Sequence, residues 1–268
     1  MHSIILTVHN KGWLISKVIE GIKENTVGEY ELIVVIDGCN DNSEEEVIKS
    51  IEGVKNYTIL YADNVFETTA NNIGLKEAEG DKVIIVQDDM IIKEKGWNER
   101  MEKPFIAFDD VFAVTARTAH NWAWNPYSQH YGMKDDLDDC WCDIVLHIDH
   151  AQRNNTSRDI FAVRNTVNRG PLMMDHEDLK TMGYFDEAFA PQDMDDHDLM
   201  HRVYKELNKV CGCYWIDFES QDSWGGTRVT GSPSPWLYKA HHKNSKIFYG
   251  RHRDLINSPN HNEDRELK

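Results

Sequence analysis

The chain has no long apolar run. No stretch of its 268 residues approaches the roughly 20 apolar residues that a membrane-spanning helix needs, so we expect no transmembrane segment. Met1-His2-Ser3 leads directly into a strand-like run, without the basic region or the cleavage site of a signal peptide. These absences predict a cytoplasmic protein, and peripheral contact with a membrane stays open.

Basic side chains are scarce as well. The chain has 29 Lys and Arg against 46 Asp and Glu, a formal net charge of −17. A nucleic-acid backbone is neutralised by clustered Lys and Arg, so this composition predicts no nucleic-acid partner. A nucleotide substrate remains compatible with it, because a metal ion can screen the phosphates.

Cysteine is rare and odd in number. Of the five, Cys39 stands alone, and the other four form two C-x-C pairs, Cys140 with Cys142 and Cys211 with Cys213. Four thiolates can hold zinc, but C-x-C lacks the usual spacer, and strand alternation puts both thiols of such a pair on one face. We therefore expect buried free thiols in a reducing compartment.

The most informative stretch is the apolar run 82–86, which continues into Gln87, Asp88 and Asp89. Such a run is typical of a strand that is buried on both faces of a parallel sheet. Two acids at its end are unfavourable in a core, yet the crevice at the carboxyl edge of an open α/β sheet is where ligands bind. The pair is either half of a divalent-cation site shared with substrate phosphates or an acidic turn.

The rest of the first ninety residues alternates between strands and helices. Strand patterns occur at 3–8, 30–36 and 57–61, and helical patterns at 13–25, from Ser43 onward and at 71–78. This order predicts stacked βαβ units, hence an α/β fold with a parallel sheet. No G-x-G-x-x-G follows the first strand, so the ordinary dinucleotide fingerprint is absent.

These motifs resemble the nucleotide-binding half of a GT-A-fold glycosyltransferase, specifically of family 2. The matching blocks are Thr7-Val8-His9-Asn10, Asp37 to Ser43, Asn64 to Leu75, Ala78 to Asp81 and Gln87-Asp88-Asp89. In the last block, which corresponds to the D-x-D motif, Gln87 replaces the first acid. The resemblance implies that Asp89 binds Mn²⁺ or Mg²⁺, with Asp88 as a less certain neighbour.

The same resemblance implies a set of nucleotide-sugar-binding residues. They are Val8, His9, Asn10, Asp37, Asn64, Asn71 and Asp88. Backbone groups around the first three would frame the base. Asp37, at the end of a strand, would accept bonds from the base or ribose, although Asp-Gly is also a common turn pair.

Two further blocks in the second half continue the resemblance. The segment 170–187 ends in a G-x-F-D-E pattern, and an acidic pair, Asp195 and Asp196, precedes x-D-L and Arg202. The implied architecture is one GT-A domain, a mostly parallel central sheet flanked by helices. We divide it into a nucleotide-binding half (1–92), an acceptor-side half (93–257) and a polar C-terminal tail (258–268) that we expect to fray.

The acidic pair is also the predicted catalytic base. Apolar residues at helical spacing from Leu199 onward place the acids at a helix N-terminus, where one or two would serve as caps. Four acids in six residues exceed that need, and their repulsion can raise the pKa of one. The resemblance implies that Asp196 takes the acceptor proton, with Asp195 as the fallback, in a single displacement with inversion.

A third metal ligand is harder to assign. The family places a His before a Gly-Gly-Thr, but this chain has Asp222-Ser223-Trp224 there. His242 is our candidate, with Asp222 as the alternative. Four aromatic residues, Trp122, Trp124, Tyr127 and Trp141, would either stack on a sugar or anchor loops.

The resulting prediction is an inverting, divalent-metal-dependent glycosyltransferase. Its donor would be a nucleotide-diphosphate sugar of the UDP, GDP or dTDP type, and its acceptor a carbohydrate or glycolipid. Two alternatives stay open. Gln87 keeps a degenerate, non-catalytic sugar-nucleotide binder possible, and acids at strand ends also suit a metal-dependent phosphoryl-transfer enzyme.

Overall fold

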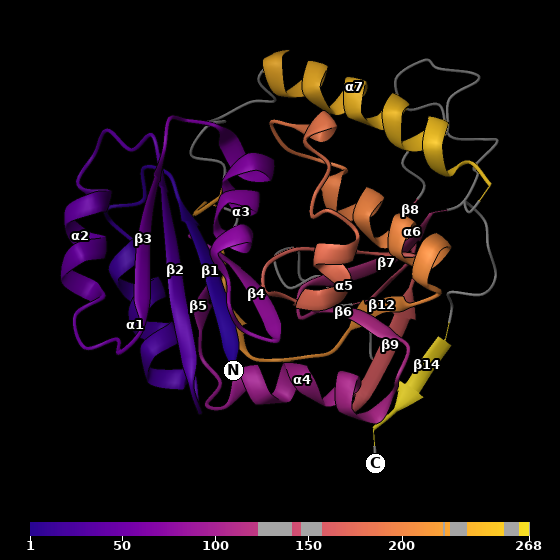
Figure 1. Ribbon diagram of the computed structural model, residues 1–268, viewed down its shortest axis with the longest axis horizontal. Coiled ribbons are helices and arrows are strands. Elements are labelled where there is room, and N and C mark those ends of the chain that lie inside the picture. The colour runs from indigo at the N-terminus through magenta and orange to yellow at the C-terminus, as the bar shows by residue number, and fades with distance from the viewer. Residues whose placement is uncertain (123–140, 146–156, 222, 226–234, 255–262, 268) are drawn as a thin grey trace.

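The computed structural model describes residues 1–122, 141–145, 157–221, 223–225, 235–254 and 263–267 (Figure 1). It confirms the α/β class. A nine-stranded central sheet has the order β14-β9-β12-β6-β11-β4-β1-β2-β3. Its strands are β1 (His2–Val8), β2 (Tyr30–Asp37), β3 (Tyr57–Ala62), β4 (Lys82–Gln87), β6 (Val111–Thr115), β9 (Ile160–Arg164), β11 (Leu172–Asp175), β12 (Val210–Cys213) and β14 (Glu263–Glu266).

Two small sheets accompany it. One has the order β10-β7-β8 and the other pairs β13 with β5. Their strands are β5 (Ile91–Ile92), β7 (Thr118–Trp122), β8 (Trp141–Val145), β10 (Thr166–Asn168) and β13 (Phe218–Glu219). Trp122 and Trp141 are register partners at the ends of β7 and β8, whereas Trp124 and Tyr127 lie outside the described residues.

The strands from the first ninety residues form a parallel block. β1 lies between β2 and β4, with Ile5 beside Ile33 on one side and Ile85 on the other. The side chains at 83–86 alternate between two apolar clusters, one on each face of the sheet, and all four are fully buried. The expected two-sided burial is confirmed, and it puts the ends of β1, β2 and β4 at one edge.

The sheet continues without interruption into the second half. β11 runs antiparallel between β4 and β6, and β12 is parallel to β6 and antiparallel to β9. Residues 1–92 and 93–257 therefore share one sheet.

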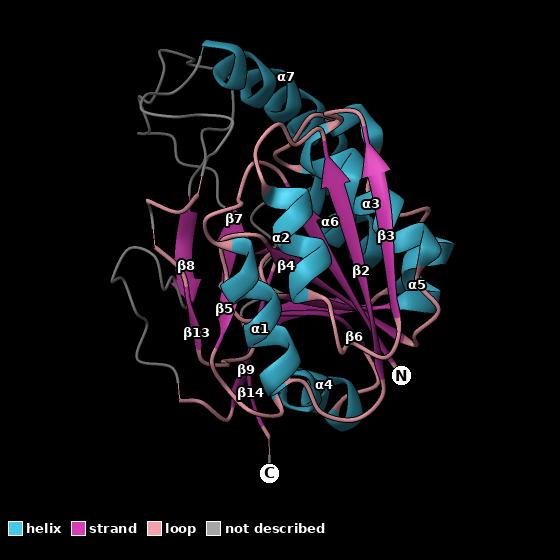
Figure 2. Ribbon diagram, turned by 90° about the vertical axis from the view of Figure 1, so that its left-hand side faces the viewer, coloured by secondary structure: helices cyan, strands magenta, loops and turns pink. Residues whose placement is uncertain are grey.

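Helices cover both faces of this sheet (Figure 2). They are α1 (Ile15–Asn25), α2 (Ser43–Ser50), α3 (Phe66–Glu77), α4 (Trp97–Ala107), α5 (His176–Thr181), α6 (Asp195–Leu207), α7 (Pro235–His252) and the short 3-10 helix η3 (Glu187–Phe189). Helices α1, α2 and α4 contribute to one apolar cluster, and α3, α5 and α6 to the other. Helix α7 packs on α6 and η3 (Figure 1).

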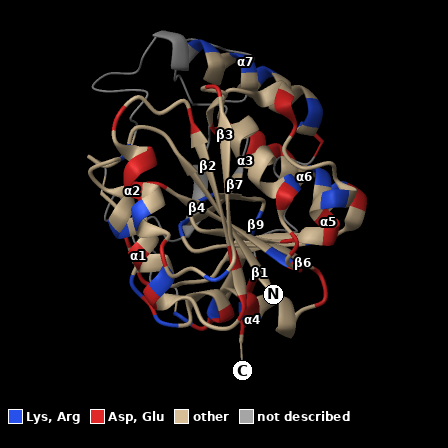
Figure 3. Cartoon of the chain, turned by 60° about the vertical axis from the view of Figure 1, so that its left-hand side comes forward, with Lys and Arg blue, Asp and Glu red and all other residues tan. Residues whose placement is uncertain are grey.

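The charges on these helices are mixed. Acidic and basic residues both occur on α1, α2, α5 and α6 (Figure 3). Across the described residues, no helix is both long and apolar enough to cross a membrane.

Helix α3 starts earlier than the predicted position 71. It begins at Phe66, because the carboxylate of Asp37 accepts hydrogen bonds from the backbone N–H groups of Val65 (2.7 Å) and Phe66 (2.8 Å). A carboxylate at a helix N-terminus satisfies free N–H groups and complements the helix dipole. Because this cap comes from another strand, it leaves no local signal in the sequence.

The C-terminal tail differs from expectation at Glu263–Glu266, which form the edge strand β14 against β9 instead of fraying. The guanidinium of Arg265 bonds both carboxylate oxygens of Asp110 (2.5 and 2.9 Å) and lies over Phe108. These polar residues have low strand propensity, so non-local contacts decide their conformation. Residues 258–262 lie outside the described part of the chain.

The expectation of buried free thiols is confirmed for Cys211 and Cys213. Cys39, Cys211 and Cys213 are free, and the last two are buried in the same apolar cluster, on one face of β12. Burial raises the pKa of both thiols, so they are unreactive core side chains.

Candidate active site

The carboxyl ends of β1, β2 and β4 bring three predicted residues together. The backbone N–H of His9 donates to the Asp88 carboxylate (3.0 Å), and His9 Nδ1 donates to the carbonyl oxygen of Asp37 (2.6 Å). His9 therefore links the ends of two neighbouring strands. This is the edge at which α/β sheets bind ligands.

The turn after β1 is built to hold this edge. Asn10 adopts a left-handed conformation (φ 51°), and its side-chain oxygen accepts a hydrogen bond from the N–H of Asn40 (2.8 Å). Val8 is 1% exposed, so its side chain belongs to the core. Its carbonyl oxygen accepts from the Cys39 thiol (3.4 Å), which leaves only the backbone of Val8 near the edge.

Asp37 has a structural task that we had not expected. Its side chain is 2% exposed, and its two oxygens cap α3. Asn64, also left-handed (φ 56°), is exposed beside it and packs against Gly38, where an added Cβ would come within 2.7 Å of the Asn64 Cβ. Gly38 therefore lets the turns after β2 and β3 approach closely. Nucleotide contact by Asp37 and Asn64 stays a prediction.

Asn71 lies one turn into α3 and is fully buried. Neither atom of its side-chain amide has a hydrogen-bond partner among the described residues. Such a group is rare in a core. Contact between Asn71 and the nucleotide-sugar donor stays a prediction.

The first acid after β4, Asp88, has a raised pKa. Desolvation raises the pKa of Asp88 to about 7; Lys11 opposes this rise, and Asp89 adds to it. A carboxylate whose ionisation is hindered by burial and by an adjacent acid fits a hard divalent cation, which binds through carboxylate oxygens and relieves the repulsion. Asp89 and Asp88 are thus the residues that would hold Mn²⁺ or Mg²⁺.

His242 does not join this pair. It lies on α7, and the described residues contain no group of three or more His, Cys, Asp or Glu that could hold a metal ion. Helix α7, which carries His242, packs on α6 and η3, and a metal-binding role of His242 stays a prediction. The alternative, Asp222, lies outside the described residues.

Lys11 is a site residue that sequence reasoning missed. It is only 1% exposed, and its ammonium donates to the backbone carbonyl of Trp224. The rings of Trp13 and Trp224 meet edge to face, 6.4 Å apart. Lys11 is thus a cation near Asp88, and its hydrogen bond to Trp224 holds residues 223–225 beside the same edge.

The predicted base lies at the start of α6, as expected. Asp195 is fully buried, whereas Asp196 is 6% exposed. One oxygen of Asp196 accepts from the N–H of His197 (2.9 Å) and the other from the N–H of Arg169 (3.3 Å). Desolvation alone would raise the pKa of Asp196, but His197 and Arg169 hold it below its usual value.

The rise in pKa that we expected among these crowded acids occurs at Asp195 and not at Asp196. Burial raises the pKa of Asp195, although Arg169 opposes this, and Asp195 forms an ion pair with that guanidinium. Asp196 is therefore the acid of the pair whose ionised form is favoured, and Asp195 is the more deeply buried partner of Arg169.

Arg169 is the second residue that the sequence did not reveal. It is 5% exposed and pairs with acids from two helices, Glu67 of α3 (3.6 Å) and Asp195 and Asp196 of α6 (3.6 Å to Asp196). A buried charge needs such partners. Nothing adjacent to Arg169 in the sequence signals a contact with Glu67, about a hundred residues earlier.

Helix α7 holds the loop that presents these acids. Asp193 and Met194 are both left-handed (φ 81° and 65°), an unfavourable conformation for these residues. The buried Asn244 amide donates to the carbonyls of Phe189 (2.6 Å), Gln192 (2.8 Å) and Asp193 (3.0 Å). Asn244 is thus the third missed residue, and it supports the strained entry into α6.

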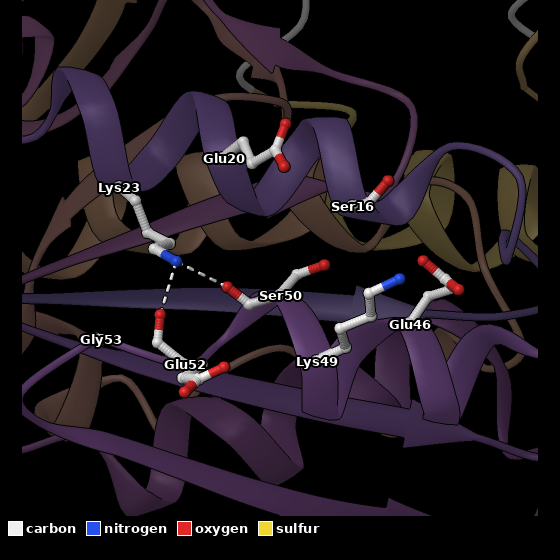
Figure 4. Close-up of a pocket in the computed structure, with 8 residues that line it drawn as sticks. All are labelled: Ser16, Glu20, Lys23, Glu46, Lys49, Ser50, Glu52 and Gly53. Carbon is white, nitrogen blue, oxygen red and sulfur yellow. Dashed lines mark hydrogen bonds between the residues drawn. The ribbon is translucent and has the colours of Figure 1, made fainter.

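A separate cavity of about 410 Å³ lies between α1 and α2 (Figure 4). Lys23 reaches across it, and its ammonium donates to the carbonyls of Ser50 (2.8 Å) and Glu52 (2.6 Å). None of the predicted site residues lines this cavity. It is therefore distinct from the edge where His9, Asp37 and Asp88 meet.

Three comparisons bear on this architecture. Two curated proteins match about a third of the chain. Glycosyltransferase GlyG of Streptococcus pneumoniae serotype 4 (strain ATCC BAA-334 / TIGR4) is 30% identical over 93 residues, which are 34% of this chain and 31% of that protein. Poly(ribitol-phosphate) beta-N-acetylglucosaminyltransferase TarP of Staphylococcus aureus (strain N315) is 28% identical over 96 residues, which are 35% of this chain and 29% of that protein. The chain thus spans about a third of each relative's length.

Solved structures agree on the fold. The structure of S. aureus TarS 1–349 in complex with UDP-GlcNAc is similar with a TM-score of 0.58 at 15% identity, covering 95% of this chain and 73% of that one. GalNAc-T7 with UDP, GalNAc and Mn²⁺ is similar with a TM-score of 0.59 at 14% identity, covering 97% and 52%. These likenesses confirm the predicted GT-A architecture.

The family comparison covers the larger part of the chain. The model described as Glycosyl transferase family 2 matches residues 3–172, which include β1 to β4, the acids after β4 and Arg169. Since this match covers more than half of the 268 residues, the chain belongs to glycosyl transferase family 2.

Proposed function

We propose that this protein is an inverting, divalent-metal-dependent glycosyltransferase. The observation that carries the proposal is Asp196, an ionised and slightly exposed carboxylate at the start of α6. Backbone N–H groups of His197 and Arg169 hold both of its oxygens in place at the start of α6. A protein that only binds a nucleotide sugar has no use for this arrangement.

The donor we propose is a UDP-sugar, and the acceptor a hydroxyl of a glycan or glycolipid. TarS has been solved with UDP-GlcNAc and GalNAc-T7 with UDP, GalNAc and Mn²⁺, and the fold is shared. TarP is named for transfer to poly(ribitol-phosphate). GDP and dTDP sugars are the competing donors. Action in the cytoplasm is part of the same proposal, and the free thiols agree with it.

The proposed reaction is a single displacement. Asp196 accepts the proton of the acceptor hydroxyl while that oxygen attacks the anomeric carbon of the donor, and the bond from this carbon to the diphosphate oxygen breaks. Attack from the face opposite the diphosphate inverts the configuration. Asp88 and Asp89 would hold the cation, which when bound supplies Lewis-acid neutralisation of the leaving diphosphate.

Positioning comes from the chain's own residues. His9 and Asp37 fix the ends of β1 and β2 to each other, and Asn244 fixes the loop before α6. Holding donor and acceptor in line removes most of the entropic cost of their encounter.

The degenerate-binder alternative is kept by one observation, Gln87 in place of an acid. Calorimetric titration of UDP, GDP and dTDP, each with Mn²⁺ and with EDTA, tests the donor half. Release of UDP from a UDP-sugar in the presence of candidate acceptors tests the transfer. Binding of one nucleotide only with metal, with turnover, supports the transferase; binding without turnover by any acceptor supports the degenerate binder.

A further inference from the structure

Gln87 faces a different side of the sheet from the acids that follow it. It is the last residue of β4, two positions after Ile85, whose side chain packs with α3 and α6. Strand alternation therefore points Gln87 toward those helices. Asp88, in contrast, accepts a hydrogen bond from His9 after β1.

Both polar atoms of the Gln87 side-chain amide make hydrogen bonds. Its Nε2 donates to Glu67 Oε1 (2.9 Å), and its Oε1 accepts from Arg117 Nη1 (3.1 Å). Gly170 lies against the same oxygen, and a Cβ added there would collide with it. Only an amide both donates and accepts at this length, so neither Glu nor Met can replace both bonds.

Glu67 is the acid that this amide holds. It follows Phe66, whose N–H is capped by Asp37, so the start of α3 is placed by the end of β2. Glu67 Oε1 faces both Gln87 and the Arg169 guanidinium. Glu67 Oε2 makes no hydrogen bond within the described residues, and the side chain is 28% exposed. The carboxylate thus has one oxygen without a bond to the described residues, on a side chain that is partly exposed, and burial raises its pKa.

The position of Glu67 lies between the two parts of the candidate site. On one side Gln87 connects it to the strand that carries Asp88 and Asp89, and on the other Arg169 connects it to Asp196. An acid at position 87 would face Glu67 as a like charge, whereas Gln87 is attracted to it. Gln87 and Glu67 are therefore mutually compatible, and an acid at both positions is not.

We propose that Glu67 supplies the donor-binding carboxylate that position 87 lacks. Its free oxygen accepts a hydrogen bond from a hydroxyl of the bound nucleotide sugar, and Gln87 and Arg117 are positioning residues that orient it. The inference rests on the proposed function, because it needs a nucleotide-sugar donor. In this inference the carboxylate is supplied by Glu67 on α3, and the amide of Gln87 stands at the position on β4 where the acid would otherwise be.

The test is an exchange of the two side chains. Glu67→Gln should weaken Mn²⁺-dependent UDP or UDP-sugar binding by about tenfold to hundredfold, as expected for a lost bond to a charged group. Gln87→Glu should weaken it through like-charge repulsion. The double variant Glu67→Gln/Gln87→Glu regains an amide–carboxylate pair and returns the acid to β4, so its affinity should recover most of the loss. Glu77→Gln, exposed at the end of the same helix, is the matched control.

Two ligand pairs identify which hydroxyl is read. If the ribose hydroxyl is the partner, 2′-deoxy-UDP should bind the wild type more weakly than UDP but bind Glu67→Gln equally. If a sugar hydroxyl is the partner, Glu67→Gln should weaken UDP-sugar binding and leave UDP binding unchanged. Either pattern supports the inference, and a purely structural role of Glu67 would produce neither.

The failures are distinguishable. If the wild type binds no nucleotide under any condition, the proposed function fails and this inference fails with it. If the wild type binds UDP-sugar and Glu67→Gln binds UDP and UDP-sugar as tightly, the inference is overturned while the proposed function stands. If both single variants lose affinity and the double variant loses at least the sum of their effects, the exchange of roles is overturned.

Discussion

The two halves of this molecule build their parts of the site in different ways. In residues 1–92, His9, Asp37 and Asp88 follow the ends of three neighbouring parallel strands and meet because the strands do. In residues 93–257, Asp196 depends on Arg169 from a loop and on Asn244 from α7 for its position. The first arrangement follows from chain order, and the second exists only after packing.

The halves also differ in how they treat negative charge. Burial raises the pKa of Asp88 to about 7, and Lys11 opposes this rise. Asp196 lies beside Arg169 and His197, and its pKa is lowered. The nucleotide-binding half is therefore the one that needs an external cation, while the acceptor-side half is neutralised from within.

The largest effect should come from Asp196→Asn. Loss of the base should lower kcat by about 100-fold to 10,000-fold, the range of a general base, while the Kd for UDP stays close to that of the wild type. Steady-state kinetics and calorimetry on the same preparation measure both. Glu206→Gln, exposed on the same helix, is the control. Full turnover by Asp196→Asn would remove Asp196 as the base.

The substitution Asp89→Ala tests the nucleotide-binding half of the site. We expect Mn²⁺-dependent UDP binding to weaken by about 100-fold, because the cation loses a carboxylate ligand worth several kcal/mol. Calorimetry should show this loss of UDP affinity in the presence of Mn²⁺ and no further loss in the presence of EDTA. Asp63→Asn, an exposed acid at the same edge, should bind as the wild type does. Equal binding by Asp89→Ala and the wild type would contradict the site.

Asn244→Ala probes the support of the acceptor-side half. Removing the amide leaves buried carbonyls of the loop before α6 without a donor, which should cost about 1–3 kcal/mol of stability. We expect kcat to fall while the Kd for UDP stays unchanged, together with a lower Tm. Lys246→Ala, exposed on α7, is the control. A change in UDP affinity without a change in kcat would show that the halves are not separable.

The smallest effect concerns pH. The pKa of Asp88 is about 7 in the folded protein against 3.8 in its reference state, so between pH 4 and pH 7 the folded state keeps a proton that the unfolded state has lost. In metal-free buffer, stability should fall as the pH rises through this window and level off above it. Asp88 is partly exposed, so we expect a difference on the order of 1 kcal/mol.

Denaturant unfolding of the wild type and Asp88→Asn at pH 5 and pH 8, with EDTA, measures this term. The variant should lose less stability between the two pH values than the wild type does. Identical changes in both proteins would mean that Asp88 titrates as an ordinary surface acid.

Local patterns were enough to predict the strands of the nucleotide-binding half. The apolar run 83–86 predicted a buried strand, and the position of Asp88 and Asp89 after it placed them at the sheet edge. The spacing of apolar residues after Asp196 predicted helix α6. Strand and helix periodicity is written in neighbouring residues, which explains why these assignments survive.

The failed assignments all involve distant partners. Asp37 caps α3 from the end of another strand, and Glu263–Glu266 pair with β9. Arg169 and Glu67 meet across about a hundred residues. No periodicity records such contacts, because they depend on how completed elements pack.

The sequence by itself determined the α/β class, the parallel block and which acids end strands or begin helices, since these depend on apolar spacing along the chain. Only the tertiary structure decided the charge state of those acids and the side chains that hold them. A pKa depends on desolvation and on nearby charges. For Asp88, Asp195 and Asp196 those charges come from Lys11, Glu67 and Arg169, which folding alone brings close.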